Sequence, residues 1–60
     1  MTEYKVMAKG KHDKRFHCYG HYTESYHADK SAVSLAKDLW TRQVKVIVLD
    51  GYTKEELTYK

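Results

Sequence analysis

The chain has 60 residues, of which 42% are hydrophobic and 32% charged, and it carries a formal charge of +3 with histidine neutral. That length accommodates one domain, and such a small domain buries only about 60% of the surface that its unfolded chain exposes. The single cysteine excludes an intrachain disulfide, and the longest apolar run, 46–49, is far shorter than the roughly 20 residues that span a bilayer. No leader-like pattern follows Met1, so we expect a cytoplasmic protein with no membrane contact.

Two stretches near the N-terminus alternate between apolar and polar residues, which is the period of a half-buried strand. The first covers 4–9 and the second covers 15–22, and the glycine-containing segment 10–14 between them is typical of a hairpin loop. Gly20 lies inside the second strand, where glycine often marks a bulge or a close approach of the backbone. The sequence therefore predicts a β-hairpin at the start of the chain.

A helix is predicted in the middle of the chain, after a connecting loop over 23–28. Asp29 or Ser31 is its expected cap, because both side chains can accept hydrogen bonds from free N–H groups of the first turn. Apolar residues then recur at the spacing of an amphipathic helix. They are Ala32, Leu35, Ala36, Leu39 and Trp40. We expect this helix to end near Arg42.

The segment 44–50 is rich in β-branched residues and predicts a third strand, apolar on both faces and therefore central or covered on both sides. The C-terminal residues 53–60 allow two interpretations. Asp50-Gly51 is a hairpin signal that favours a strand over 56–59. Thr53 followed by Glu56 is a capping box that favours a helical turn. We favour the strand, because the segment is too short for a stable helix.

These elements predict a single α+β domain over residues 1–60, with the order β-β-α-β and a further β-strand at the end. One helix packs on one face of a sheet of three to four strands. The connection through the helix could be a right-handed parallel crossover, which would pair the third strand in parallel with the first or second. The sheet face expected to meet the helix comprises Tyr4, Val6, Ala8, Phe16, Cys18, Val44, Val46 and Val48.

The opposite sheet face has no second helix to cover it, and exposed apolar patches often mark interaction surfaces. The candidate interaction surface, including the neighbouring hairpin loop, comprises Met7, Lys11, Lys14, Arg15, His17, Tyr19, His21, Ile47 and Leu49. In the alternative interpretation the C-terminal segment folds over Ile47 and Leu49, and the rest is a solvated face.

Histidine and cysteine cluster in His17-Cys18-x-x-His21, with His27 and His12 nearby, and zinc prefers such ligands. Alternation directs Cys18 away from His17 and His21, and these two histidines are roughly 13 Å apart on an extended strand. We therefore expect a buried Cys18 thiol, surface histidines and no metal. A metal shared by these residues would require a break in the strand. No nucleophile–base pair, paired carboxylates or phosphate-binding loop stands out, so we expect no enzyme and no cofactor.

Our leading hypothesis is a non-enzymatic binding or regulatory module that acts through protein–protein contacts, with homodimerisation through the open face or an edge strand as one form. The alternative is nucleic-acid binding, because exposed aromatic and basic side chains on a sheet can stack on bases and contact phosphates. Its residues would be Lys11, Lys14, Arg15, His17 and Tyr19. The sequence names no particular partner.

Three segments carry a resemblance that spans most of the chain: the hairpin start Tyr4–Gly10, the helix Ala32–Leu39 and the strand Val44–Gly51. In this layout the chain resembles small uncharacterised open reading frames of Gram-positive bacteria and their phages. The resemblance brings no catalytic residues. It implies a small accessory or host-directed binding protein.

Overall fold

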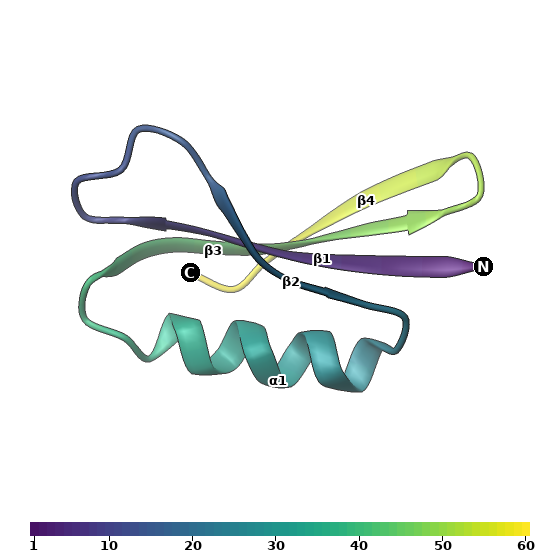
Figure 1. Cartoon of the computed structure of the whole chain (residues 1–60), viewed down its shortest axis with the longest axis horizontal. Coiled ribbons are helices and arrows are strands. Elements are labelled where there is room, and N and C mark those ends of the chain that lie inside the picture. Colours follow the sequence, from purple (N-terminus) through teal and green to yellow (C-terminus); the bar gives the residue numbers. More distant parts are fainter.

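The computed structural model describes all 60 residues and contains a four-stranded antiparallel sheet with one helix on one of its faces (Figure 1). The elements in chain order are β1 (Thr2–Gly10), β2 (His17–Tyr22), α1 (Ser25–Ala36), β3 (Thr41–Asp50) and β4 (Thr53–Thr58). The sheet order is β2-β1-β3-β4. The predicted α+β class, the element order and the strand at the C-terminus are confirmed.

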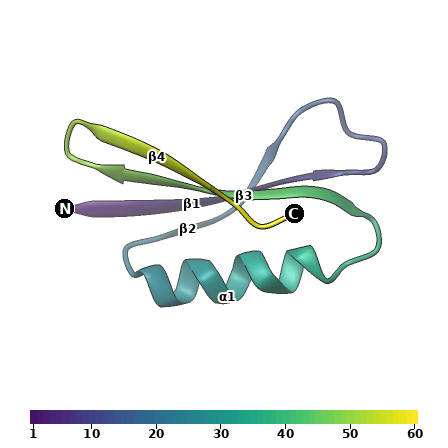
Figure 2. The same cartoon turned by 180° about the vertical axis from the view of Figure 1, so that it is seen from behind.

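The parallel pairing that a crossover through the helix could have given the third strand does not occur. β3 pairs antiparallel with β1 along its whole length, from Thr2 opposite Asp50 to Gly10 opposite Thr41. Because β2 also runs antiparallel to β1, α1 connects two strands of the same direction that are separated by β1 (Figure 2). A long antiparallel ladder forms slightly stronger pairs per residue than a parallel one, and it makes β1 and β3 the central strands.

The helix begins earlier than predicted. α1 starts at Ser25, inside the segment expected to be a loop, and Asp29 and Ser31 lie within the helix rather than at its cap. The reason is that the apolar stripe extends backwards to Ala28, one turn before Ala32, and both alanines are fully buried. No side chain caps the first turn, so packing rather than a capping signal sets this end.

The helix also ends earlier than predicted, at Ala36. Asp38 forms the turn that follows, because its Oδ1 accepts the Trp40 N–H at 2.9 Å and its backbone carbonyl accepts the Thr41 N–H at 3.2 Å. Leu39 and Trp40 therefore lie beyond the helix with 89% and 68% of their surface exposed. Their predicted place in the core stripe is wrong.

The buried core consists of small side chains from the two central strands and the helix. Its members are Val6, Ala8, Ala28, Ala32, Val44 and Val46. The alanines let α1 approach the sheet closely, and each buried valine contributes roughly 1.5 kcal/mol or more to stability. Tyr4, Tyr22, Leu35, Ala36, Val48 and Tyr59 pack around this core. The predicted helix-facing residues of β1 and β3 are confirmed.

A bulge in β2 reverses the predicted faces of His17 and Cys18, whereas His21 and Tyr22 keep their predicted faces. Val6 lies opposite Gly20 but Met7 lies opposite Cys18, so Tyr19 is an extra residue. Residues that face each other across two strands share a sheet face, and one inserted residue exchanges the faces beyond it. Cys18 therefore shares the open face with Met7 and is exposed, contrary to the prediction of a buried thiol.

Phe16 also lies on the open face rather than under the helix. The Lys45 ammonium lies 4.3 Å from the centroid of the Phe16 ring, and the Lys9 ammonium lies 5.1 Å from it. Lys45 faces Met7 across the sheet, which fixes the side on which this contact forms.

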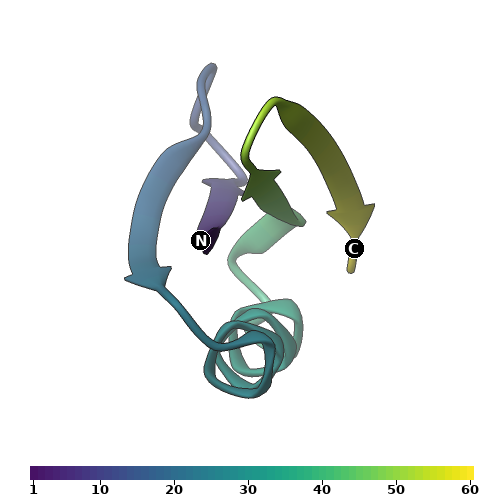
Figure 3. The same cartoon turned by 90° about the vertical axis from the view of Figure 1, so that its right-hand side faces the viewer.

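The C-terminal residues return to the helix side after β4 ends. The Tyr59 hydroxyl donates a 2.6 Å hydrogen bond to Asp29 Oδ1 on α1, and the Tyr59 N–H donates to the Val44 carbonyl at 2.8 Å. The hydrogen bond to Asp29, together with burial and the negative charge of Asp29, raises the pKa of Tyr59 to about 12. This segment therefore does not fold over Ile47 and Leu49. It packs beside α1 on the helix side, and the other face of the sheet stays open (Figure 3).

Candidate functional site

The predicted interaction surface is divided among three places in the structure. Of its members, the open face carries Met7, His21, Ile47 and Leu49. The loop between β1 and β2 carries Lys11, Lys14 and Arg15 at one end of the sheet. His17 and Tyr19 lie on the helix side, because His17 faces the buried Ala8 and the bulge turns Tyr19 towards α1. The predicted stripe of basic and aromatic residues along β2 is therefore not formed.

The open face is largely covered by its own side chains. Met7, Ile47 and Leu49 are only partly exposed. Lys45 lies over the Phe16 ring and donates a 3.0 Å hydrogen bond to Glu56 Oε1 on β4. That hydrogen bond and the charge of Lys45 lower the pKa of Glu56 below its usual 4.5. This face therefore presents paired charges and lysine stems rather than a broad apolar patch.

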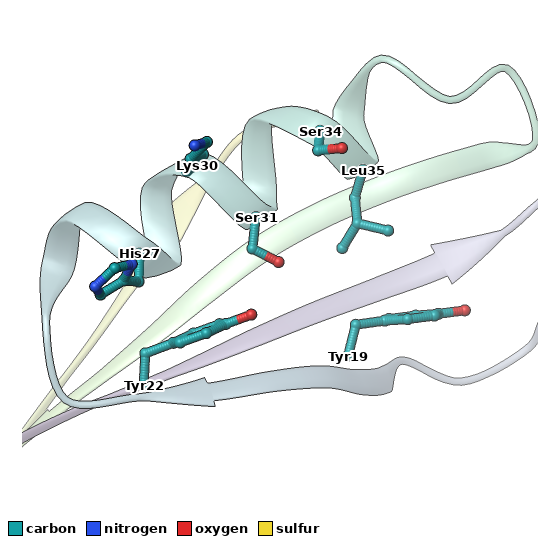
Figure 4. Close-up of a pocket in the computed structure, with 7 residues that line it drawn as sticks. All are labelled: Tyr19, Tyr22, His27, Lys30, Ser31, Ser34 and Leu35. Carbon is teal, nitrogen blue, oxygen red and sulfur yellow. The ribbon is translucent and has the colours of Figure 1, made fainter.

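A groove of approximately 500 Å³ runs between β2 and α1. Tyr19 and Tyr22 project from β2 towards the helix, and Ser31 and Leu35 point back from α1 towards the two rings (Figure 4). The full lining consists of Tyr19, Tyr22, His27, Lys30, Ser31, Ser34 and Leu35. We call this the β2–α1 groove.

Gly20 and the bulge build the floor of the β2–α1 groove. A Cβ atom on Gly20 would lie 2.5 Å from Tyr22 Cε2, so the Tyr22 ring can lie over the backbone only because residue 20 has no side chain. The bulge adds Tyr19 to the same side, and this ring remains 55% exposed. Two tyrosines of one short strand thus face the helix.

An aromatic cluster closes the end of the groove where α1 begins. The Tyr22 and His27 rings stack with centroids 6.3 Å apart, and Tyr26 meets His27 edge-on at 5.5 Å. Such pairs fix ring orientation beyond what apolar burial provides. The groove is therefore preformed at this end.

The groove carries positive charge. Lys30 is among its lining residues, no carboxylate is, and His27 adds charge when protonated. Glu24 lies just outside, with its Oε2 3.6 Å from His27 Nε2. The hydroxyls of Ser31 and Ser34 supply neutral hydrogen-bonding groups along the helix wall. An acidic or hydroxyl-bearing ligand matches this lining.

The outer edge of β2 pairs with no other strand and carries no charged residue that would prevent such pairing. β2 pairs with β1 alone, so its other edge presents free backbone N–H and C=O groups. Its sequence, HCYGHY, contains no Lys, Arg, Asp, Glu or Pro. The other edge strand, β4, carries Lys54, Glu55 and Glu56, and charged side chains are what proteins commonly use to prevent edge pairing.

Three of the four histidines, His17, His21 and His27, each lie near a different carboxylate. Nε2 of His17 lies 3.7 Å from Asp13, and Nε2 of His21 lies 3.8 Å from Glu3. The Cys18 thiol lies 3.5 Å from the Gly20 carbonyl. The structure brings together no group of three or more histidine, cysteine or acidic residues that could hold a metal ion.

Sequence reasoning missed the helix side of the groove. Tyr22 was expected on the second strand, His27 in the connecting loop, Lys30 on the outer face of the helix and Leu35 in its core stripe. The cap was expected at Asp29 or Ser31, five or seven residues after the observed cap at Glu24, so the first turns of the helix were missed. Had Ala28 been included in the stripe, the spacing of His27, Ser31 and Ser34 would have placed a second, partly polar helix face beside β2.

A comparison with protein-family models, curated proteins and solved structures found no match for this chain. The resemblance to small Gram-positive and phage reading frames therefore stays a prediction. No helix in the structure has the length and apolar character that crossing a membrane requires.

Proposed function

We propose that this protein is a non-enzymatic binding module that receives an extended segment of a partner protein in the β2–α1 groove, as an added strand on the edge of β2. The observation that carries the proposal is an unpaired edge without charged residues, lying directly beside a preformed aromatic groove. Strand addition of this kind is a common mode of peptide recognition.

The two parts of the site have separate roles. The free N–H and C=O groups of β2 supply main-chain hydrogen bonds, which give affinity with little dependence on sequence. Alternate side chains of the added strand, about 6.6 Å apart, point into the groove and contact Tyr19, Tyr22 and Leu35. Exposed tyrosines are favoured at binding hot spots, because they bury much area and lose little conformational freedom.

Charge favours a different protein over a second copy of this chain. Antiparallel pairing of two β2 edges would bring two copies of the same groove together, each with Lys30 and no lining carboxylate. Like charges across an interface disfavour it. A partner segment with an acidic residue near Lys30 and an apolar residue above Tyr19 is the better match.

The test is selection of linear peptides from a display library, followed by affinity measurement and amide chemical-shift mapping. We expect acidic peptides whose shifts concentrate in β2 and α1. Tyr19→Lys places a charge on the free edge and should weaken binding at least tenfold, about 1.4 kcal/mol. The matched control is Tyr52→Lys, the same change at a fully exposed tyrosine in the β3–β4 turn.

A peptide variant separates strand addition from side-chain docking. N-methylation of every second amide should abolish binding in one register, because those amides donate to β2, and leave it intact in the other. The proposal would be contradicted if N-methylation had equal effects in both registers, or if the Tyr19→Lys and Tyr52→Lys variants bound peptide with equal affinity. Chemical-shift changes that map to the open face would also contradict it.

A further inference from the structure

Two loops meet at the end of the molecule opposite the chain's N-terminus. They are the β1–β2 loop, 11–16, and the α1–β3 loop, 37–40 (Figures 1 and 2). The Lys11 N–H donates a 2.9 Å hydrogen bond to the Trp40 carbonyl, and the Lys11 ammonium lies 5.8 Å from the centre of the Trp40 ring. We call this region the basic end.

The two loops of the basic end, together with the flanking Lys9 and Arg42, hold six of the 11 lysine and arginine residues and two of the eight carboxylates. The six are Lys9, Lys11, Lys14, Arg15, Lys37 and Arg42. None of them forms an ion pair; the carboxylates of Asp13 and Asp38 instead accept the backbone N–H groups of Gly10 and Trp40.

The other end of the molecule is acidic. It holds Glu3, Glu24, Asp50 and Glu55, with Lys54 as its lysine. The long axis is 33 Å, which exceeds the screening length of about 8 Å at physiological salt. The positive field of the basic end is therefore not cancelled by the opposite end.

Trp40 is exposed but held in place. Its backbone N–H donates to Asp38 Oδ1, its backbone carbonyl accepts the Lys11 N–H, and the Lys60 ammonium donates to the Asp38 carbonyl at 3.0 Å. The indole is nevertheless 68% exposed. An exposed aromatic ring on an anchored backbone, with the Lys11 ammonium 5.8 Å from its centre, offers what single-stranded nucleic-acid binding uses: a stacking platform beside positive charge.

We propose that the basic end binds single-stranded nucleic acid, with Trp40 stacking on a base and Lys11, Lys14, Arg15 and Arg42 contacting the phosphates. This surface is separate from the β2–α1 groove, so the two proposals can fail independently. It differs from the site expected from the sequence, because His17 and Tyr19 lie on the helix side of the sheet and Trp40 takes the stacking role.

An anionic membrane is the competing ligand, because Leu39 beside Trp40 is 89% exposed and could enter lipid. The contact between Lys11 and the indole disfavours this. Insertion of the ring would carry an ammonium group towards hydrocarbon or break the contact. On a nucleic acid the same ammonium lies next to phosphate while the ring meets a base, so both groups are used.

Intrinsic fluorescence gives a direct test, because Trp40 is the single tryptophan. Titration with a 12-residue oligothymidylate should quench this fluorescence, since a stacked base contacts the ring. Affinity should fall with salt with a log–log slope of about −3, or roughly 0.7 for each of four phosphate contacts. Lack of quenching at ~100 µM protein, the weak limit for non-specific nucleic-acid binding, would overturn the proposal.

Variants then identify the contacts by anisotropy of a labelled oligonucleotide, with circular dichroism to confirm folding. Trp40→Leu keeps an apolar side chain but removes the ring, and should weaken binding roughly 5- to 150-fold. Lys14→Gln should weaken binding and reduce the salt slope by about 0.7, whereas Lys54→Gln, the same change at the acidic end, should do neither. Equal effects of the two lysine changes would contradict the assigned surface.

Leu39→Ser distinguishes the two ligand classes. It should leave oligonucleotide binding unchanged, because Leu39 makes no base contact in the proposed complex. Vesicles of phosphatidylcholine with phosphatidylserine should leave the Trp40 emission unshifted. A blue shift with these vesicles that Leu39→Ser abolishes would assign the basic end to membranes and overturn the proposal.

Discussion

The two outer strands of the sheet, β2 and β4, have the same length and opposite character. Each has six residues and pairs with one inner strand. β4 places three charged residues along its edge and is exposed throughout. β2 has none, and instead carries a bulge, a glycine and two tyrosines facing the helix. The edge strand that faces only solvent, β4, thus carries charged residues against strand pairing, whereas the edge strand beside the groove, β2, carries none.

The glycines next to the two edge strands, Gly51 and Gly20, are required for different physical reasons. Gly51, in the turn between β3 and β4, has a φ of +63°, and a Cβ atom at this position would meet no other atom within 4 Å. Backbone conformation therefore explains the presence of this glycine. Gly20 has no positive φ, and the Tyr22 ring occupies the space of its missing side chain. Gly51 therefore shapes a turn, and Gly20 shapes the floor of the β2–α1 groove.

The largest effect should follow from Gly20→Val. Its branched side chain would displace the Tyr22 ring from the edge of the core, and overpacking of this kind costs about 2–3 kcal/mol. Urea denaturation measures this loss, and peptide binding in the β2–α1 groove should fall with it. Normal groove binding in a folded Gly20→Val protein would show that Tyr22 is not part of the binding floor.

Gly51→Ala is the corresponding change beside β4, the edge strand that carries charged residues. A left-handed φ costs a non-glycine residue about 1–2 kcal/mol, so stability should fall by that amount. Peptide affinity, corrected for the folded fraction, should stay constant. A loss of affinity comparable to that of Gly20→Val would remove the distinction between the two edges.

Tyr59→Phe tests how the end of β4 is anchored to the helix. Removing the hydrogen bond to Asp29 should cost about 1 kcal/mol at neutral pH. Because folding raises the pKa of Tyr59 from 10.0 to about 12, the neutral phenol stabilises the fold below pH 10, and this contribution is lost between pH 10 and 12.

Denaturation of both proteins across this pH range provides the measurement. Their difference in unfolding free energy should be constant below pH 10 and disappear near pH 12. A difference that persists unchanged above pH 12 would mean that the phenol proton does not contribute through Asp29.

Glu56→Gln should have the smallest effect, on the ladder between β3 and β4. Lys45 lowers the pKa of Glu56, so the ionised pair stabilises the fold above pH 4.5 and is lost as the pH falls below it. The pair is exposed at Glu56 and contributes little. The variant should therefore show a slightly weaker acid dependence of its melting temperature, with unchanged groove binding. An acid dependence identical to that of the parent protein would show that the Lys45–Glu56 pair does not contribute to stability.

The sequence predicted most of the architecture, because the strand and helix patterns at the centre of the fold are regular. The alternation of Tyr4, Val6 and Ala8 and of Val44, Val46 and Val48 identified the helix-facing residues of β1 and β3. Asp50-Gly51 identified the turn into β4. These patterns are local, and the core depends directly on them.

The site could not be predicted, because it depends on one inserted residue and on a helix start without a cap. The bulge at Tyr19 exchanges the faces of Cys18 and His17, and alternation alone gives no sign of where an extra residue falls. Gly20 indicated an irregularity but not its direction. The helix start at Ser25 depends on the packing of Ala28 against the sheet. This is a tertiary contact, and no capping residue in the sequence indicates it.

Amide hydrogen exchange with a selected peptide tests the central claim most directly, because it reports on both edges in one experiment. In the free protein, the outward-facing amides of both β2 and β4 should exchange quickly. With peptide bound, those of β2 should slow at least tenfold while those of β4 do not change. Slowing confined to β4 or to the open face, or binding without slowing at β2, would contradict the account.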